Sequence, residues 1–174
     1  MSIKDTHTRY PFAPISGREG AFFFPDDFGC YYTVEISKAA GRFNKEDLLN
    51  NNGEIYEISF ESSCEDERTG KDKAVSNTII YIIGSSIASK GDTPVYFFVC
   101  DDSDNRGKAR SKLFERWYLE LHKSMPALQK HDFMVSGNND DEYHISLFIS
   151  SNHPFNADYI QRFEKNLSEN FAKN

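Results

Sequence analysis

The sequence has little of several residue types, and each shortage excludes a class of protein. Only 6 of the 174 residues are proline and 10 are glycine, which excludes a collagen-like or low-complexity chain. The three cysteines, Cys30, Cys64 and Cys100, are too few and too widely spaced for a disulfide framework or a zinc ribbon. We therefore expect reduced thiols and a cytoplasmic protein.

Long apolar runs and an excess of positive charge are also missing. No stretch approaches the roughly 20 apolar residues of a transmembrane helix, and residues 1–7 contain no apolar segment of the kind found in export signals. We expect no membrane span. The net charge of −7 opposes the basic field that supplies most non-specific nucleic-acid affinity. Nucleic-acid binding is therefore an unfavoured hypothesis.

What the chain does contain is enough apolar material for a core. Hydrophobic residues make up 39% of the sequence and aromatic residues 14%. At this length one ordinary domain is expected, and it needs no covalent or metal support. We predict a single domain over residues 1–174, with a partly extended leader at 1–19 and the core at 20–174.

Alternating apolar residues predict strands in the first part of the chain. Residues 21–24 and 30–36 flank a turn that contains Pro, Asp and Gly, so they predict a hairpin, and 54–60 repeats the alternation. Apolar residues at helical spacing predict a helix over 72–90. The β-branched run 78–83 alone favours a strand, and the length of the pattern decides for the helix.

The second part of the chain continues with strands and helices. An apolar strand at 94–100 is followed by a helix at 105–123, a hairpin of 133–135 with 143–149, and a helix that begins near Asn156. The order βββ-α-β-α-ββ-α predicts an α+β domain with a largely antiparallel sheet of about six strands and three helices. The predicted buried stripe of the 105–123 helix is Ala109, Leu113, Phe114, Trp117, Tyr118 and Leu121.

Charged residues gather where the 94–100 strand meets the following helix. Asp101, Asp102 and Asp104 follow the strand, and Arg106 and Arg110 are one helical turn apart. Carboxylates are favoured near a helix N-terminus, and the arginines can reach back to them, which indicates a structural lock between strand and helix. The same three carboxylates are also suited to a Mg²⁺ ion. We interpret the five residues as a binding or structural-lock cluster and assign no catalytic residue, metal ligand or cofactor.

Cys100 and Arg106 have the spacing of a phosphatase loop, in which a thiolate attacks phosphorus and an arginine holds the phosphoryl oxygens. The carboxylates between them would repel the phosphate dianion by several kcal/mol at short range in a low-dielectric site. Free cysteines are also among the residues most often buried. We interpret Cys100 as a buried structural residue.

No complete catalytic set is present, so the leading hypothesis is a non-enzymatic binding or regulatory module that acts on a protein partner, with self-association as one version. Its contact surface would be the sheet or the basic face of the 105–123 helix, at Lys108, Lys112 and Lys123. One alternative is a metal-assisted phosphoryl-transfer or hydrolytic enzyme that uses the Asp101, Asp102 and Asp104 loop. A weaker alternative is nucleic-acid binding through the same helix.

The densest motif runs from Cys100 to Trp117, as Cys-Asp-x-x-Asp-x-Arg-x-x-x-Arg-x-x-x-Phe-x-x-Trp. Together with Ser76-Asn77-Thr78-Ile79, this segment resembles a family of small uncharacterised Bacteroidetes proteins, and the likeness extends over about residues 20 to 150. The resemblance implies a bacterial, cytoplasmic domain of unknown function. It implies no catalytic residues.

Overall fold

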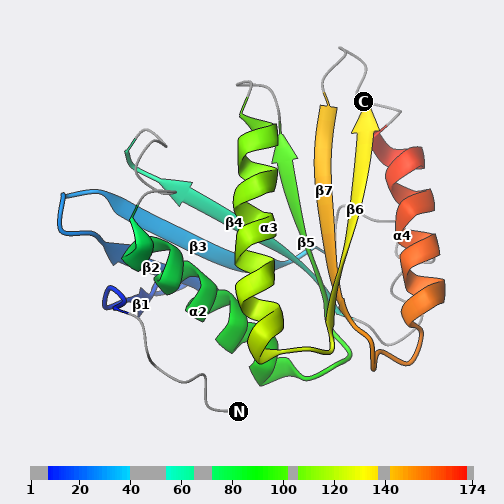
Figure 1. Cartoon of the computed structure of the whole chain (residues 1–174), viewed down its shortest axis with the longest axis horizontal. Helices are drawn as coiled ribbons and strands as arrows, with labels where there is room; N and C mark the ends of the chain where they lie inside the picture. Colours follow the sequence, from blue (N-terminus) through cyan, green and yellow to red (C-terminus); the bar gives the residue numbers. More distant parts are fainter. Residues whose placement is uncertain (1–7, 40–53, 65–71, 102–105, 137–141, 172–174) are drawn as a thin grey trace. The chain divides into compact units, whose positions relative to one another are not determined.

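The computed structural model describes residues 8–39, 54–64, 72–101, 106–136 and 142–171. Figure 1 shows the helices and strands, which carry the same labels in the text. In chain order they are β1 (Ala13–Pro14), β2 (Ala21–Pro25), β3 (Tyr31–Lys38), β4 (Ile55–Ser62), α2 (Lys73–Lys90), β5 (Val95–Asp101), α3 (Gly107–Ser124), β6 (Leu128–Ser136), β7 (Glu142–Ser150) and α4 (Asn156–Phe171).

The predicted α+β class with a largely antiparallel sheet and three helices is confirmed for the described part of the chain. The sheet has seven strands in the order β1-β2-β3-β4-β5-β7-β6, and the β4–β5 pair is parallel. The prediction of about six strands missed β1, which lies in the expected leader. A two-residue strand that contains Pro14 shows no alternation, so its pattern could not be detected.

The chain divides into two compact units. Unit 1 contains residues 1–37 and 58–90, and unit 2 contains 38–57 and 91–174. Strand β4 contributes residues to both units, and the single domain expected from the sequence stays a prediction. None of the helices in the described ranges is long and apolar enough to cross a membrane.

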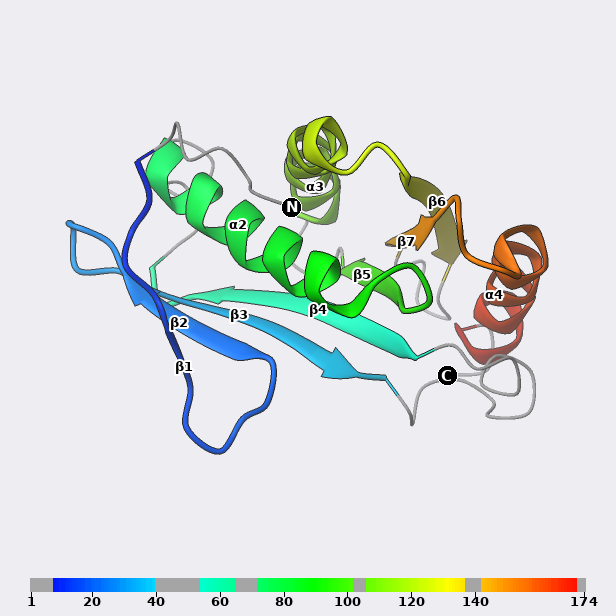
Figure 2. The same ribbon diagram turned by 90° about the horizontal axis from the view of Figure 1, so that it is seen from below.

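The core of unit 1 forms between α2 and one face of its strands (Figure 2). The helix covers the predicted range and includes residues 78–83, so the helical interpretation of that segment is confirmed. The carboxylate of Asp72 caps it by accepting a hydrogen bond from the Ala74 N–H at 2.8 Å. Tyr10 fastens the leader to the same turn, because its hydroxyl donates to Asp72 and its N–H donates to the Thr78 hydroxyl, at 3.0 and 2.9 Å.

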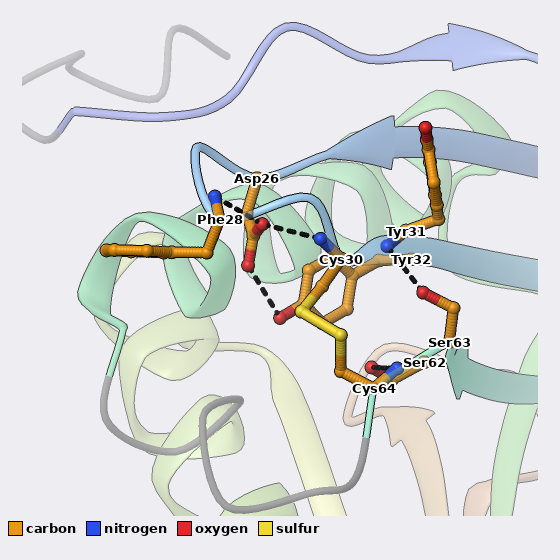
Figure 3. The surroundings of a disulfide bond; sticks show 8 residues. All are labelled: Asp26, Phe28, Cys30, Tyr31, Tyr32, Ser62, Ser63 and Cys64. Carbon is orange, nitrogen blue, oxygen red and sulfur yellow. Dashed lines mark hydrogen bonds between the residues drawn. A yellow bond between two sulfur atoms is a disulfide. The ribbon is translucent and has the colours of Figure 1, made fainter.

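The prediction of reduced thiols is wrong for two of the three cysteines. Cys30 and Cys64, which are 34 positions apart in the sequence, form a disulfide with their Cα atoms 5.5 Å apart (Figure 3). The Ser63 N–H donates to the Tyr31 carbonyl at 2.9 Å, which brings the end of β4 beside the start of β3. The pairing depends on which strands become neighbours, and sequence spacing does not reveal that.

Unit 2 covers both faces of β5, as its apolar sequence predicted. The Phe98 ring contacts Phe114 of α3 with centroids 4.1 Å apart, and the adjacent Phe97 contacts Phe163 of α4 at 5.9 Å. The two helices therefore lie on opposite faces of the strands (Figure 2). The predicted stripe of α3 is confirmed at Phe114, Trp117 and Leu121, which are buried, and wrong at Ala109, which is exposed. Fully or nearly buried residues on the α4 side are Ile55, Val95, Phe97, Ile145, Leu147, Ile149, Tyr159, Phe163 and Leu167.

Candidate functional site

The predicted cluster at the end of β5 is described only in part. Asp101 is the last residue of β5, and Arg106 is the N-cap of α3. The N–H of Arg110 donates to the Arg106 carbonyl at 2.9 Å, so the two arginines lie one helical turn apart. Asp102, Asp104 and the side chain of Asp101 are outside the described atoms. The structural lock and the metal site therefore stay predictions.

Cys100 lies in the interior of unit 2, on the α3 side of the sheet. It is the free cysteine, it is 2% exposed, and the strand register places it opposite His144 of β7. Burial raises the pKa of its thiol to about 12, although the positive charges of Arg110 and Lys130 act in the opposite direction. The thiol is therefore protonated at neutral pH, whereas a phosphatase nucleophile must be a thiolate. This supports the structural interpretation of Cys100.

Sequence reasoning missed an ion network on the same face of unit 2. The side chain of Lys130 on β6 is 5% exposed, and its Nζ lies 2.6 Å from a carboxylate oxygen of Glu115 on α3 and 2.5 Å from one of Asp132 on β6. The hydroxyl of Ser146 on β7 donates to the other oxygen of Asp132 at 2.6 Å. These four residues, called the Lys130 network below, connect α3 with β6 and β7.

The electrostatics of the Lys130 network suit a structural role. Burial lowers the pKa of Lys130, but hydrogen bonds to Asp132 and Glu115 raise it, and the net shift is upward. A lysine that acts as a general base needs a lowered pKa. Lys130 instead remains a cation at neutral pH, and its ion pair with Glu115 holds α3 against β6, which ends the sheet.

A clue to this network was present in the sequence. Lys130 and Asp132 are two positions apart, so on a strand they share a face. The predicted strand at 133–135 was too short to include them, because a run of charged residues resembles a loop. The observed β6 begins at Leu128, which places both residues in register with β7, with Asp132 opposite Ser146.

Two of the described histidines, His122 and His153, make local contacts, whereas the Nε2 of His131 is buried without a hydrogen-bond partner. The Nδ1 of His122 lies 3.0 Å from the Leu128 carbonyl oxygen, and the Nδ1 of His153 accepts the Phe155 N–H at 3.1 Å. Burial lowers the pKa of both His131 and His153. Among the described residues, no three His, Cys, Asp or Glu side chains lie close enough together to hold a metal ion.

The outer face of α3 carries a line of cations. Lys108, Lys112, Arg116 and Lys123 are exposed and recur at spacings of four, four and seven residues, which places them on one side of a helix. Leu119 lies among them and is 51% exposed. We call these five residues the α3 stripe. It includes the predicted basic face and adds Arg116 and Leu119.

The carboxylates beside the α3 stripe are already engaged. Glu115 contacts Lys130, and Glu120 forms an exposed ion pair with Lys123 at 2.7 Å. No described acidic side chain forms an ion pair with Lys108, Lys112 or Arg116. Three cations on this face are therefore available to an external partner.

Comparison of the chain with protein-family models, with curated proteins and with solved structures finds no match. The resemblance to the Bacteroidetes family stays a prediction.

Proposed function

We propose that the protein is a non-enzymatic binding module that docks a protein partner on the α3 stripe. The observation that carries the proposal is the contrast between an acidic chain and a concentrated line of exposed cations. The net charge is −7, yet Lys108, Lys112 and Arg116 follow one another along α3. No carboxylate of the described residues forms an ion pair with any of the three. Such a patch attracts acidic surfaces and repels basic ones.

The partner should present acidic residues together with an apolar side chain. Leu119 supplies exposed apolar area within the stripe, and a contact that joins apolar burial with charge complementarity is typical of protein interfaces. A nucleic acid offers continuous phosphate charge but few apolar groups to meet Leu119. The remaining negative charge of the chain would also repel it. We therefore favour a protein segment rich in Asp and Glu.

The buried polar groups of unit 2 support a binding role over an enzymatic one. Cys100 is protonated at neutral pH, and Lys130 is engaged by two carboxylates. Both groups thus serve the packing of α3 against the sheet.

We propose the cytoplasm as the compartment, as the family resemblance implies. The sequence argument for the cytoplasm assumed that all three thiols are reduced. The Cys30–Cys64 disulfide removes that argument. Cytosolic disulfides are usually transient and redox-sensing. In this compartment the bond is therefore expected to form and break with the redox state.

A direct test measures the binding of two fluorescent probes by anisotropy at low and high salt. One probe is a peptide that contains glutamates around a leucine, and the other is a single-stranded oligonucleotide of equal net charge. We expect the peptide to bind and the oligonucleotide to bind more weakly. Lys112→Glu with Arg116→Glu should weaken the peptide about tenfold, which corresponds to about 1.4 kcal/mol.

The matched control is Lys73→Glu with Lys165→Glu, which makes the same change in net charge on α2 and α4. It should alter peptide affinity by less than about threefold, since only long-range attraction is reduced. An equal loss in both double variants would show that the α3 stripe is not the docking site. Tighter binding of the oligonucleotide would replace the protein partner by a nucleic acid.

A further inference from the structure

The two ends of the Cys30–Cys64 disulfide are held by very different numbers of contacts. On the Cys30 side, the buried carboxylate of Asp26 accepts hydrogen bonds from the N–H groups of Phe28 and Cys30, both at 2.8 Å. The Tyr32 hydroxyl donates to its other oxygen at 3.2 Å (Figure 3). Asp26 thus closes the β2–β3 turn from within, independently of the disulfide.

Burial reinforces this side. Cys30 and Tyr32 are fully buried, and the Tyr32 ring stacks on Phe24 with centroids 5.0 Å apart. Burial, followed by the charge of Asp26, raises the pKa of Tyr32 to about 12, so its hydroxyl keeps the proton that it donates. The hairpin therefore has a hydrogen-bonded and packed anchor of its own.

The Cys64 side has few contacts. The Ser63 N–H donates to the Tyr31 carbonyl at 2.9 Å, and the Tyr31 N–H donates to the Ser63 hydroxyl at 2.8 Å. The third contact, from the Cys64 N–H to the Ser62 hydroxyl at 3.2 Å, is local to the same segment. Ser63 is exposed and Cys64 is half-buried. Up to Phe60, β4 is held by packing, since the Phe60 ring stacks on Tyr32 with centroids 6.1 Å apart. Beyond it, two exposed hydrogen bonds contribute little stability in water, so the disulfide is the main attachment of Ser63 and Cys64.

We propose that the disulfide is a redox switch that releases the end of β4 when it is reduced, while the β2–β3 hairpin stays closed. Release frees the N–H and C=O groups of Tyr31. They lie beside the Tyr31 and Phe23 rings, which are 52% and 38% exposed and stack 5.5 Å apart. The reduced protein thus presents an open strand edge next to an aromatic pair, and the oxidised protein hides that edge.

The chemistry requires a dithiol reductant as the co-reactant. Because Cys30 is fully buried, the dithiol's thiolate attacks the Sγ of Cys64, forms a mixed disulfide there, and displaces the Cys30 sulfur, which takes up a proton. The second thiol of the reductant then attacks the first sulfur of the reductant, which is bonded to Cys64 in the mixed disulfide. This closes the reductant's own disulfide and releases Cys64 as a thiol. Two electrons pass from the dithiol, which becomes a disulfide, to the protein.

Hydrogen exchange of single amides tests the switch, because the two sides use different N–H groups. The oxidised protein and the protein treated with dithiothreitol are compared by exchange and mass spectrometry with residue-level fragmentation. Reduction should speed the exchange of the Ser63 and Tyr31 amides at least about tenfold more than that of the Phe28 and Cys30 amides, which lose only the protection that depends on global stability.

Two variants complete the experiment. Cys64→Ser should show fast Ser63 exchange with or without dithiothreitol, and Cys100→Ser should respond as the natural sequence does. If reduction speeds the Phe28 and Cys30 amides as much as the Ser63 amide, the disulfide supports the whole hairpin and the switch is refuted. Unchanged exchange at Ser63, or three free thiols in the air-oxidised protein, would refute it equally. The natural protein supplies the decisive comparison even if a variant fails to fold.

Discussion

The two units of the molecule stabilise their strands in different ways. In unit 2, α3 and α4 cover both faces of β5, so adjacent residues such as Phe97 and Phe98 are each buried in a different layer. In unit 1, α2 covers one face, and the opposite face keeps Phe23 and Tyr31 partly in solvent. The disulfide belongs to unit 1, whereas the cysteine of unit 2 remains free.

This difference shows how covalent support and apolar burial substitute for one another. A strand that is covered on both sides removes the apolar side chains of both its faces from water, and each Å² of apolar surface buried stabilises the fold by about 25 cal/mol. A layer that is covered on one side gains less stabilisation from apolar burial. Disulfides contribute most to proteins whose apolar cores are small. The comparison therefore predicts that unit 2 is sensitive to the loss of core side chains and unit 1 to the loss of the bond.

The largest effect should come from Trp117→Ala. Trp117 is 2% exposed and packs edge-on against Phe114 at 5.1 Å, so its removal leaves a large cavity between α3 and the sheet. Truncation of a buried Trp costs about 3 to 5 kcal/mol, a large share of the roughly 5 to 15 kcal/mol by which domains are stable. Urea unfolding followed by far-UV circular dichroism measures the loss.

Leu119→Ala is the matched control on the same helix. Leu119 is 51% exposed, so its truncation should change the free energy of unfolding by no more than about 0.5 kcal/mol. Near-normal stability of Trp117→Ala would contradict the two-sided core of unit 2.

Reduction of the disulfide should have the next largest effect. The bond closes a loop of 34 residues, and the chain-entropy model assigns such a loop about 3 to 4 kcal/mol of stabilisation. Because the sequence has one tryptophan, Trp117 fluorescence follows unit 2, while circular dichroism follows both units. If the chain is one cooperative domain, as its length predicts, dithiothreitol should lower both urea midpoints together. A shift by circular dichroism alone would mean that the units unfold separately.

The same contrast explains which parts of the fold could be predicted from the sequence. Helix α2 and the β2–β3 hairpin follow from local signals, since Asp72 and the Pro-Asp-Asp-Phe-Gly turn act within a few residues. Strand β5 was found because it is apolar on both faces. β6 was largely missed, because Lys130 and Asp132 are stabilised by partners on other elements and local patterns do not contain them.

The candidate sites also divide into those that local sequence patterns predict and those that depend on contacts between distant segments. The lysines of the α3 stripe were predicted, because helical spacing along one element fixes which residues share a face. The disulfide was not, since it requires the end of β4 to lie beside β3. The Asp102 and Asp104 loop falls outside the described residues, so the structural lock and the metal site stay predictions.

A smaller effect is expected for Lys130→Met, which removes the charge at the centre of the Lys130 network. The methionine retains most of the apolar stem, and the carboxylates of Glu115 and Asp132, which are 48% and 61% exposed, can turn to water. We therefore expect a loss of about 1 kcal/mol, with solvent screening taken into account. Lys123→Met removes one partner of an ion pair whose side chains are 70% and 50% exposed, and it should leave the free energy of unfolding unchanged in the same urea measurement.

The pH dependence of this loss follows from the direction of the pKa shift. The folded-state pKa of Lys130 is raised, so its contribution is complete below the unfolded value of about 10.4 and disappears as pH rises through the folded value. The pKa of Tyr32 is raised to about 12, so the stabilisation from its protonated hydroxyl is also lost at high pH, but this loss is the same in both proteins. The difference between natural and Lys130→Met proteins should therefore be constant from pH 7 to 9 and shrink above it. A difference that grows above pH 10 would contradict the network.

The smallest expected effect is that of divalent metal ions on the melting temperature, and it separates the binding module from the metal-assisted enzyme. If Asp101, Asp102 and Asp104 are turned onto the arginines of α3, no site is open. Millimolar Mg²⁺ or Mn²⁺ should then leave the thermal midpoint unchanged. A real site bound only in the folded state would stabilise it by about 2.7 kcal/mol at a concentration 100 times the Kd, which is easily measured. Asp101→Asn with Asp104→Asn provides the control. A saturable rise that disappears in this variant would show that unit 2 keeps carboxylates for chemistry as well as for structure, and it would favour the enzyme over the binding module.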